Sequence, residues 1–254
     1  MKRIWLVSLI VIIALIFTSI PAMAASQNSD DIIKLKFIQY PKHEAAKPAG
    51  GGGPALTGTL CPDYKYQGIH WATSEVRYYV NASGENEQGI KDSFATWNAA
   101  STGINFKYEG SSGVQEAARD NKNVVYWGPV EYSNAIAVTY FWYSRATKQI
   151  VEVDTVMNVS LPWAYEDVGG PEYLSGDARP IASRYEDPTD ESDPDSYDVR
   201  NIMTHEAGHW ILLNDLYNSR DSKLTMYGYG DYGEISKDTL GYGDELGIER
   251  VYGP

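Results

Sequence analysis

Two histidines and a glutamate in the C-terminal quarter of the sequence have the residue types and spacing of a metal site. His205 and His209 are four positions apart, and Glu206 directly follows the first histidine. On an α-helix, positions i and i+4 share a face, so both imidazoles can reach one ion. Neutral imidazole nitrogens suit Zn²⁺, and an adjacent carboxylate can take a proton from a water held by the ion. The pattern predicts the chemistry of a zinc peptidase.

A catalytic zinc usually has three protein ligands, so a third residue is needed. The two other histidines are His43, in an N-terminal segment expected to lie outside the catalytic domain, and His70, just before the first expected strand. A carboxylate is therefore favoured, and the candidates are Asp215, six residues beyond His209, and Glu234, twenty-five beyond it. Glycines and tyrosines precede Glu234, a poor setting for a ligand-bearing helix. We favour Asp215; Glu234 would instead imply a gluzincin-type peptidase.

The elements that must position these residues can be read from hydrophobic periodicity and β-propensity. Strands are expected over residues 76–80, 104–108, 123–127, 135–143 and 150–158, and helices over residues 87–101, 197–213 and 239–252. The histidine pair lies in the second of these helices. A turn region rich in glycine and tyrosine, residues 227–233, separates it from the closing helix.

The segment from His205 to Asp215 resembles the zinc motif of the metzincin peptidases, whose third ligand is usually His and in some members Asp. Met226 lies in a segment similar to the Met-turn that supports the zinc site from below. Residues 240–253 resemble the terminal helix of the matrixin-like peptidases. The likeness covers residues 71–253, and its specificity lies mainly in the zinc motif and the ending.

This resemblance implies an α+β, zincin-like fold with a twisted, mainly parallel five-stranded sheet, an active-site helix and a C-terminal helix. It implies one catalytic Zn²⁺ bound by His205, His209 and Asp215, with Glu206 as the catalytic base and Met226 as a structural support. The substrates would be proteins or peptides that add as a strand to the sheet edge at residues 135–143.

Two residues bear on how far the resemblance extends. The turn glycine of the family is Leu212 here, and because a β-carbon in the left-handed region costs on the order of 1–2 kcal/mol, the turn is expected to shift to Asn214. Cys61, followed by a Pro-Asp pair, is similar to the cysteine switch by which a matrixin pro-segment blocks the zinc. The alternative for Cys61 is a small buried hydrophobic residue.

The N-terminus predicts export. Lys2 and Arg3 precede an apolar run and an Ala-Met-Ala processing site, so residues 1–24 are expected to be a signal peptide, and an uncleaved membrane anchor is the alternative. Residues 25–58 are a predicted pro-segment or flexible linker, containing a strand-like piece at 32–40 and four consecutive glycines at 50–53. Residues 59–254 form the expected catalytic domain, secreted or tethered at the cell surface.

Composition restricts partners and further ligands. The formal net charge of −13 opposes binding to nucleic acid phosphates, and no membrane contact is expected beyond an uncleaved anchor. Cys61 is the single cysteine, so an intramolecular disulfide is excluded. Carboxylates are dense over residues 186–198, but their spacing matches no defined Ca²⁺ motif, and we interpret them as a solvated acidic loop. A monomer is expected.

A second class of function stays open. The many aromatic residues and Leu212 are compatible with a non-catalytic secreted binding module on the same fold. Such a module would be expected to have lost Glu206, which is present.

Overall fold

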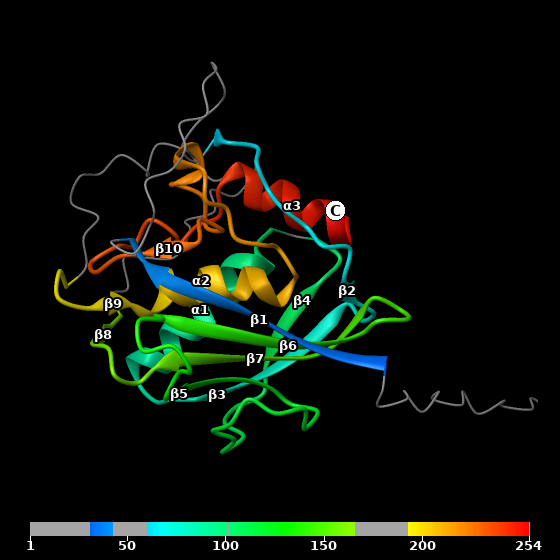
Figure 1. The fold of residues 1–254 in the computed structure, drawn as a ribbon, viewed down its shortest axis with the longest axis horizontal. Coiled ribbons are helices and arrows are strands. Elements are labelled where there is room, and N and C mark those ends of the chain that lie inside the picture. Colours follow the sequence, from blue (N-terminus) through cyan, green and yellow to red (C-terminus); the bar gives the residue numbers. More distant parts are fainter. Residues whose placement is uncertain (1–30, 43–59, 101, 166–192, 254) are drawn as a thin grey trace, which may run out of the picture.

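The computed structural model of the protein describes residues 31–42, 60–100, 102–165 and 193–253 (Figure 1). The predicted signal peptide, the glycine run and most of the acidic segment at 186–198 lie outside the described residues. Within the described part of the chain, no helix is both long and apolar enough to cross a membrane.

Among the described residues the fold is α+β, with a mixed and mostly parallel sheet and three α-helices. The helices are α1 (Glu85–Asn98), α2 (Val199–Trp210) and α3 (Tyr242–Tyr252), with a 3₁₀ turn η5 (Ser219–Asp221). The strands are β1 (Ile32–Pro41), β2 (His70–Trp71), β3 (Glu75–Asn81), β4 (Asn105–Tyr108), β5 (Asn123–Gly128), β6 (Ala137–Ser144), β7 (Gln149–Asn158), β8 (Trp163–Ala164), β9 (Tyr197–Asp198) and β10 (Tyr229–Gly230).

Sheet topology extends the expected arrangement. The strand order is β10-β1-β6-β7-β5-β3-β4, and β2 pairs with β7. The pairs β3–β4, β3–β5, β5–β7, β2–β7 and β1–β10 are parallel, whereas β6 is antiparallel to both β7 and β1. The sheet therefore has eight strands among the described residues, where five were expected. The additional strands are the two-residue β2 and β10 and the long β1, whose pairing partners are remote in sequence.

The core lies between the sheet and the pair α1 and α2. On α1, the spacing of Ile90, Phe94 and Trp97 directs all three side chains inward, where they are buried. Trp210 at the end of α2 packs edge-on against Phe94, and its indole N–H donates to the Thr155 hydroxyl on β7 at 2.9 Å. These contacts fix α2 against the sheet, so the residues that follow Trp210 leave the helix from a defined point.

Helix α2 begins and ends with specific caps. The Asp198 side chain accepts a hydrogen bond from the Asn201 N–H at 2.7 Å, which satisfies one of the free donors of the first turn. At the other end, Leu212 N–H donates to His209 O and Leu213 N–H donates to Gly208 O, the pattern of a Schellman turn. Leu212 itself has a φ of 58°. The expected shift of the turn to Asn214 is therefore wrong: Leu212 takes the left-handed position, and its side chain is fully buried there.

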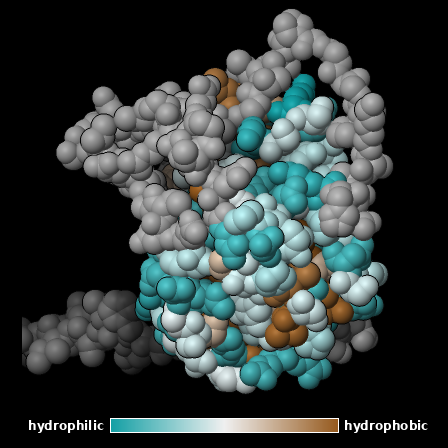
Figure 2. All heavy atoms as spheres, turned by 90° about the vertical axis from the view of Figure 1, so that its left-hand side faces the viewer, coloured by the Kyte–Doolittle hydropathy of each residue, from teal (hydrophilic) through white to brown (hydrophobic). Residues whose placement is uncertain are grey.

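The surface reflects the composition. Figure 2 shows that the face on the left-hand side of Figure 1 carries mostly hydrophilic side chains in its described part, with apolar side chains gathered in a small area. The sequence has 22% charged residues and a formal net charge of −13, so acidic side chains outnumber basic ones.

Candidate metal centre and active site

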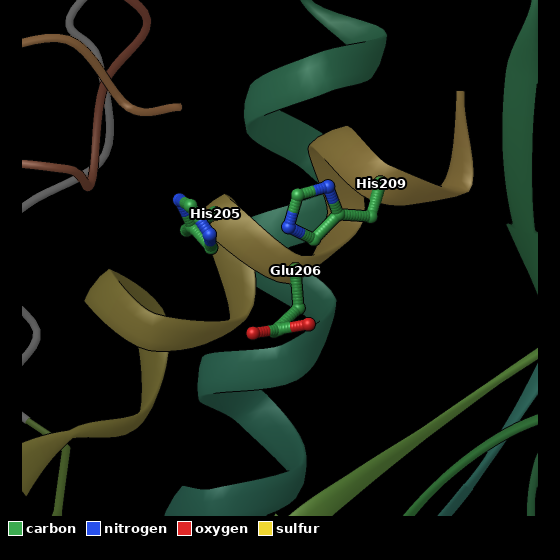
Figure 3. A group of neighbouring side chains, drawn as sticks. All are labelled: His205, Glu206 and His209. Carbon is green, nitrogen blue, oxygen red and sulfur yellow. The ribbon is translucent and has the colours of Figure 1, made fainter. Parts of the chain in front are cut away.

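The three residues that first indicated a metal site come together on consecutive turns of α2 (Figure 3). One ligand atom from each of His205, Glu206 and His209 lies within 4.8 Å of the others, and all three side chains are fully buried. The two imidazoles are nearly perpendicular, at 87°, with ring centroids 4.8 Å apart.

Backbone carbonyls define which imidazole nitrogen is free. His205 Nδ1 lies 2.7 Å from Thr225 O, and His209 Nδ1 lies 2.7 Å from Leu213 O. A carbonyl only accepts, so each Nδ1 carries the proton and donates it. In a neutral imidazole this leaves a lone pair on Nε2, the arrangement that a carbonyl partner gives to histidine metal ligands.

Asp215 completes the group. Its Oδ1 atom lies 3.1 Å from His205 Nε2 and 3.5 Å from His209 Nε2. None of these three buried atoms has a hydrogen-bond partner within the described part of the chain. Three lone-pair atoms that face one another without a proton or cation repel, so the arrangement calls for a positive charge at their centre.

The donor set and its spacing fit Zn²⁺. Two imidazole nitrogens and one carboxylate oxygen are a common catalytic set for this ion, with a fourth position left for water. Ligands about 2.1 Å from a tetrahedral ion lie about 3.4 Å from each other. The two distances from Asp215 Oδ1 lie close to that value.

In the absence of a metal ion, a proton on one of the histidines would reduce the repulsion between the two Nε2 atoms and the Asp215 carboxylate. Burial lowers the pKa of His205 to about 4, which keeps this imidazole neutral at pH 7. Burial also acts to lower the pKa of His209, but the neighbouring Asp215 carboxylate outweighs it and raises that pKa above its usual value. The Asp215 carboxylate therefore favours the protonated form of His209 when no metal is bound.

The loop after α2 brings Asp215 back to the histidines. Leu216 N–H donates to Met226 O at 2.8 Å, and Gly228 N–H donates to Leu216 O at 2.9 Å. Next to Asp215, the Asn214 N–H donates to Lys65 O at 2.9 Å. With these bonds on both sides, the position of the carboxylate is fixed by backbone pairing.

Glu206 has one bonded and one free carboxylate oxygen among the described residues. Its Oε2 atom accepts a hydrogen bond from the Thr139 hydroxyl on β6 at 2.5 Å, and its Oε1 atom has no partner within the described residues. Burial raises the pKa of Glu206 to about 7. A carboxylate with a free oxygen and such a pKa can both accept and return a proton near neutral pH.

Met226 supports the helix from the side of Gly208. A β-carbon added at Gly208 would lie 2.1 Å from Met226 Sδ, so only glycine lets the helix approach this side chain. The Asp244 carboxylate accepts from the N–H groups of Thr225 and Met226 at 2.8 and 3.1 Å. Since Thr225 O is also the partner of His205 Nδ1, Asp244 helps to orient that imidazole.

Glu234, the alternative third ligand, and Cys61, the candidate zinc-blocking cysteine, each have other hydrogen-bond partners. The Glu234 carboxylate accepts from Lys42 Nζ at 2.8 Å and from the Ser236 hydroxyl at 3.0 Å. Cys61 is fully buried, and its thiol donates to Asp221 Oδ1 at 3.2 Å. Burial raises the pKa of this thiol, which disfavours the thiolate that a zinc-blocking cysteine needs. The structure brings Asp215 to the histidines and leaves Glu234 and Cys61 with partners of their own.

Sequence analysis missed several residues of the site. Thr139 and Asp244 are common polar residues whose roles depend on contacts across the fold. Lys237 is fully buried, and its ammonium group donates to the carbonyls of Tyr227 at 2.8 Å and Tyr229 at 2.5 Å. Phe37 stacks on the His209 ring with centroids 3.9 Å apart and an interplanar angle of 9°. Only Phe37 had a local indication, because it lies in the strand-like piece of the N-terminal segment.

Comparison with known proteins adds no assignment. No protein-family model matches this sequence, and a search of curated proteins finds none that is similar to it.

Proposed function

We propose that this protein is a secreted zinc-dependent endopeptidase of the metzincin type that hydrolyses peptide bonds in proteins. One observation carries the proposal: His205 Nε2, His209 Nε2 and Asp215 Oδ1 converge as buried, unpartnered lone-pair atoms. A carboxylate oxygen of Glu206 lies within 4.8 Å of a ring nitrogen of each of the two histidines. A purely structural cluster would be expected to satisfy its own hydrogen bonds.

The roles of the residues follow from their positions. His205, His209 and Asp215 would hold the ion, which when bound supplies a Lewis acid that polarises a peptide carbonyl and lowers the pKa of water. Glu206 takes the proton from the attacking water and passes it to the leaving amine. The hydroxyl of Thr139 keeps the Glu206 carboxylate in one orientation.

An aspartate ligand affects the pH range. With Asp215 in place of a third histidine, the net charge of the site is about one unit less positive. A water activated at this site would be less acidic than at a site of three neutral imidazoles, so the pH–rate profile is expected to shift toward alkaline pH. The N-terminal sequence supports export of the protein before it acts.

The first test compares two chains that begin at Ala25, the native sequence and its Glu206→Ala variant. Hydrolysis of casein by the native chain alone, with equal zinc content in both, would support a peptidase in which Glu206 is the base. If the variant cleaves casein at the native rate, Glu206 is not the base and the proposal fails.

The third ligand is tested by two further substitutions. Asp215→Ala is expected to weaken zinc binding strongly. Glu234→Ala should leave zinc binding unchanged, because it removes only the ion pair with Lys42. The opposite result would identify a gluzincin-type site.

A further inference from the structure

Lys237 is a buried cation in the loop that leads from β10 to α3. Its side chain is fully buried, whereas the other lysines in the described part of the chain lie at least partly in solvent. An ammonium group in such a place costs free energy unless hydrogen bonds and opposite charges compensate for the lost water. The groups that compensate Lys237 therefore indicate which part of the molecule needs it.

Two backbone carbonyls accept the hydrogen bonds of the Lys237 ammonium group. They belong to Tyr227, at 2.8 Å, and to Tyr229, at 2.5 Å. These carbonyls flank Gly228, so one side chain holds the backbone on both sides of that residue. The backbone N–H of Lys237 donates to the Asn201 side chain on α2 at 2.7 Å. The loop is thereby tied to the helix that carries the two histidines.

Three carboxylates balance the charge of Lys237 from farther away, and two of them belong to the candidate active site. Burial lowers the pKa of Lys237 to about 8, and the charges of Glu234, Asp215 and Glu206 act in the opposite direction. The ammonium group is therefore mostly protonated near neutral pH. Because Asp215 also repels the Glu206 carboxylate, a fixed positive charge beside both reduces that repulsion.

The segment that Lys237 holds packs directly against Asp215. Gly228 N–H donates to Leu216 O at 2.9 Å, which pairs the two segments next to the carboxylate. A β-carbon at Gly228 would lie 3.0 Å from Asp215 Cβ and would collide with the Tyr217 ring. With so little space between them, a shift of this segment would displace the Asp215 carboxylate from the two histidines.

We propose that Lys237 is the positioning residue for the third metal ligand: its ammonium group holds residues 227–229 against Asp215 and so keeps the Asp215 carboxylate beside the histidines. This inference rests on the proposed zinc site, and it gives Lys237 a role that touches neither the ion nor the substrate. A neutral side chain of the same length would leave two carbonyls without their buried donor, so the segment would loosen. A lysine that only stabilised the fold as a whole would have no specific effect on Asp215.

Zinc affinity in a double-mutant cycle tests this role, with all variants made in the full-length chain and measured against a chromophoric chelator. Lys237→Met keeps the length of the side chain and removes its donors and its charge. It should weaken zinc binding by about 10–100-fold, the usual effect of removing an outer partner of a metal ligand. In an Asp215→Ala background the same change should not weaken zinc binding, because the ligand that Lys237 positions is already absent. An equal loss in both backgrounds, or no loss in the native one, would overturn the proposal.

Lys42→Met is the matched control. Lys42 is also a cation next to Glu234, at 2.8 Å, but its ammonium group bonds this carboxylate and lies partly in solvent. Zinc affinity should therefore be unchanged in the control, and a loss equal to that of Lys237→Met would show that any nearby positive charge is sufficient. If Lys237→Met does not fold, Lys237→Gln takes its place in the cycle, because its amide can still donate to one of the two carbonyls.

Amide hydrogen exchange in the metal-free protein separates this inference from the proposed function. The N–H groups of Leu216 and Gly228 pair the two segments, and in Lys237→Met they should exchange about tenfold faster while those of α1 keep the native rate. Uniformly faster exchange would mean a loss of global stability and would overturn the proposal. If the native chain binds no zinc, the proposed function fails, and the exchange rates alone decide whether Lys237 holds the segment beside Asp215.

Discussion

The sulfur of Met226 lies against the backbone of Gly208, in the middle of the helical turn that carries Glu206 and His209. A β-carbon at Gly208 would lie 2.1 Å from Met226 Sδ and 2.9 Å from the Trp97 ring. No real contact is this short, so any larger residue must move either α2 or the loop that carries Met226.

Gly208→Ala is therefore expected to disturb the metal site. Overpacking of this kind costs about 1–3 kcal/mol of unfolding free energy, and the displaced His209 should weaken zinc binding. Met226→Ala creates space, so the double variant should be more stable than the sum of the two single effects predicts. Thermal unfolding of the four chains tests this coupling, and strict additivity would contradict the contact.

Metal affinity is expected to depend on pH through His209. Because the pKa of His209 lies above its usual value while that of His205 falls to about 4, zinc must displace a proton from His209 only. Affinity should rise with increasing pH and level off above the His209 pKa. Competition with a chromophoric chelator between about pH 5 and 8 measures this. In Asp215→Ala, affinity should fall and the pH dependence should move to lower pH, because the carboxylate that raises the His209 pKa is gone.

Thr139→Val is expected to lower the rate of hydrolysis by about tenfold, since a hydrogen bond to a charged group contributes about 1.5–3 kcal/mol. The Thr139 hydroxyl lowers the pKa of Glu206, which burial raises to about 7. Its loss should move the acid limb of the pH–rate profile to higher pH, because Glu206 must be ionised to act. A bound cation lowers the pKa of Glu206 in both the native protein and the Thr139→Val variant. The variant should therefore still have the higher Glu206 pKa of the two.

Thr139→Ser keeps the hydroxyl and should restore both the rate and the acid limb. A Val variant with a lower rate but an unshifted limb would mean that Thr139 acts through packing alone.

Much of the fold could be predicted locally. The strands at 75–81, 123–128 and 149–158 and helix α1 have periodic apolar residues that bury one face, and their bounds differ from expectation by at most three residues. The two histidines follow from helical spacing alone. Local patterns are sufficient here because each element has its own hydrophobic face.

The remaining parts depend on contacts distant in sequence. Pairing of β1 with β6 joins residues about a hundred positions apart, and neither strand encodes its partner. Asp244 and Thr139 look like ordinary surface residues until the fold places them against Thr225 and Glu206. The turn at Leu212 was mispredicted because intrinsic propensity favours Asn in the left-handed region, whereas burial of the Leu212 side chain outweighs that preference.

Leu212→Gly tests which of two opposing contributions to stability is larger at this turn: the backbone strain of the left-handed conformation or the burial of the leucine side chain. Glycine removes a left-handed strain of about 1–2 kcal/mol, but the loss of a buried leucine costs about 2–5 kcal/mol. The variant is therefore expected to be less stable by on the order of 1–3 kcal/mol, although it restores the glycine typical of such turns.

Lys148 is the matched control, because its φ is also 58° while its side chain is exposed. Lys148→Gly should raise the unfolding free energy, since it relieves the same strain without removing buried surface. Chemical denaturation of both variants measures the two changes, and stabilisation by Leu212→Gly would show that backbone strain, not burial, dominates the turn before Asp215.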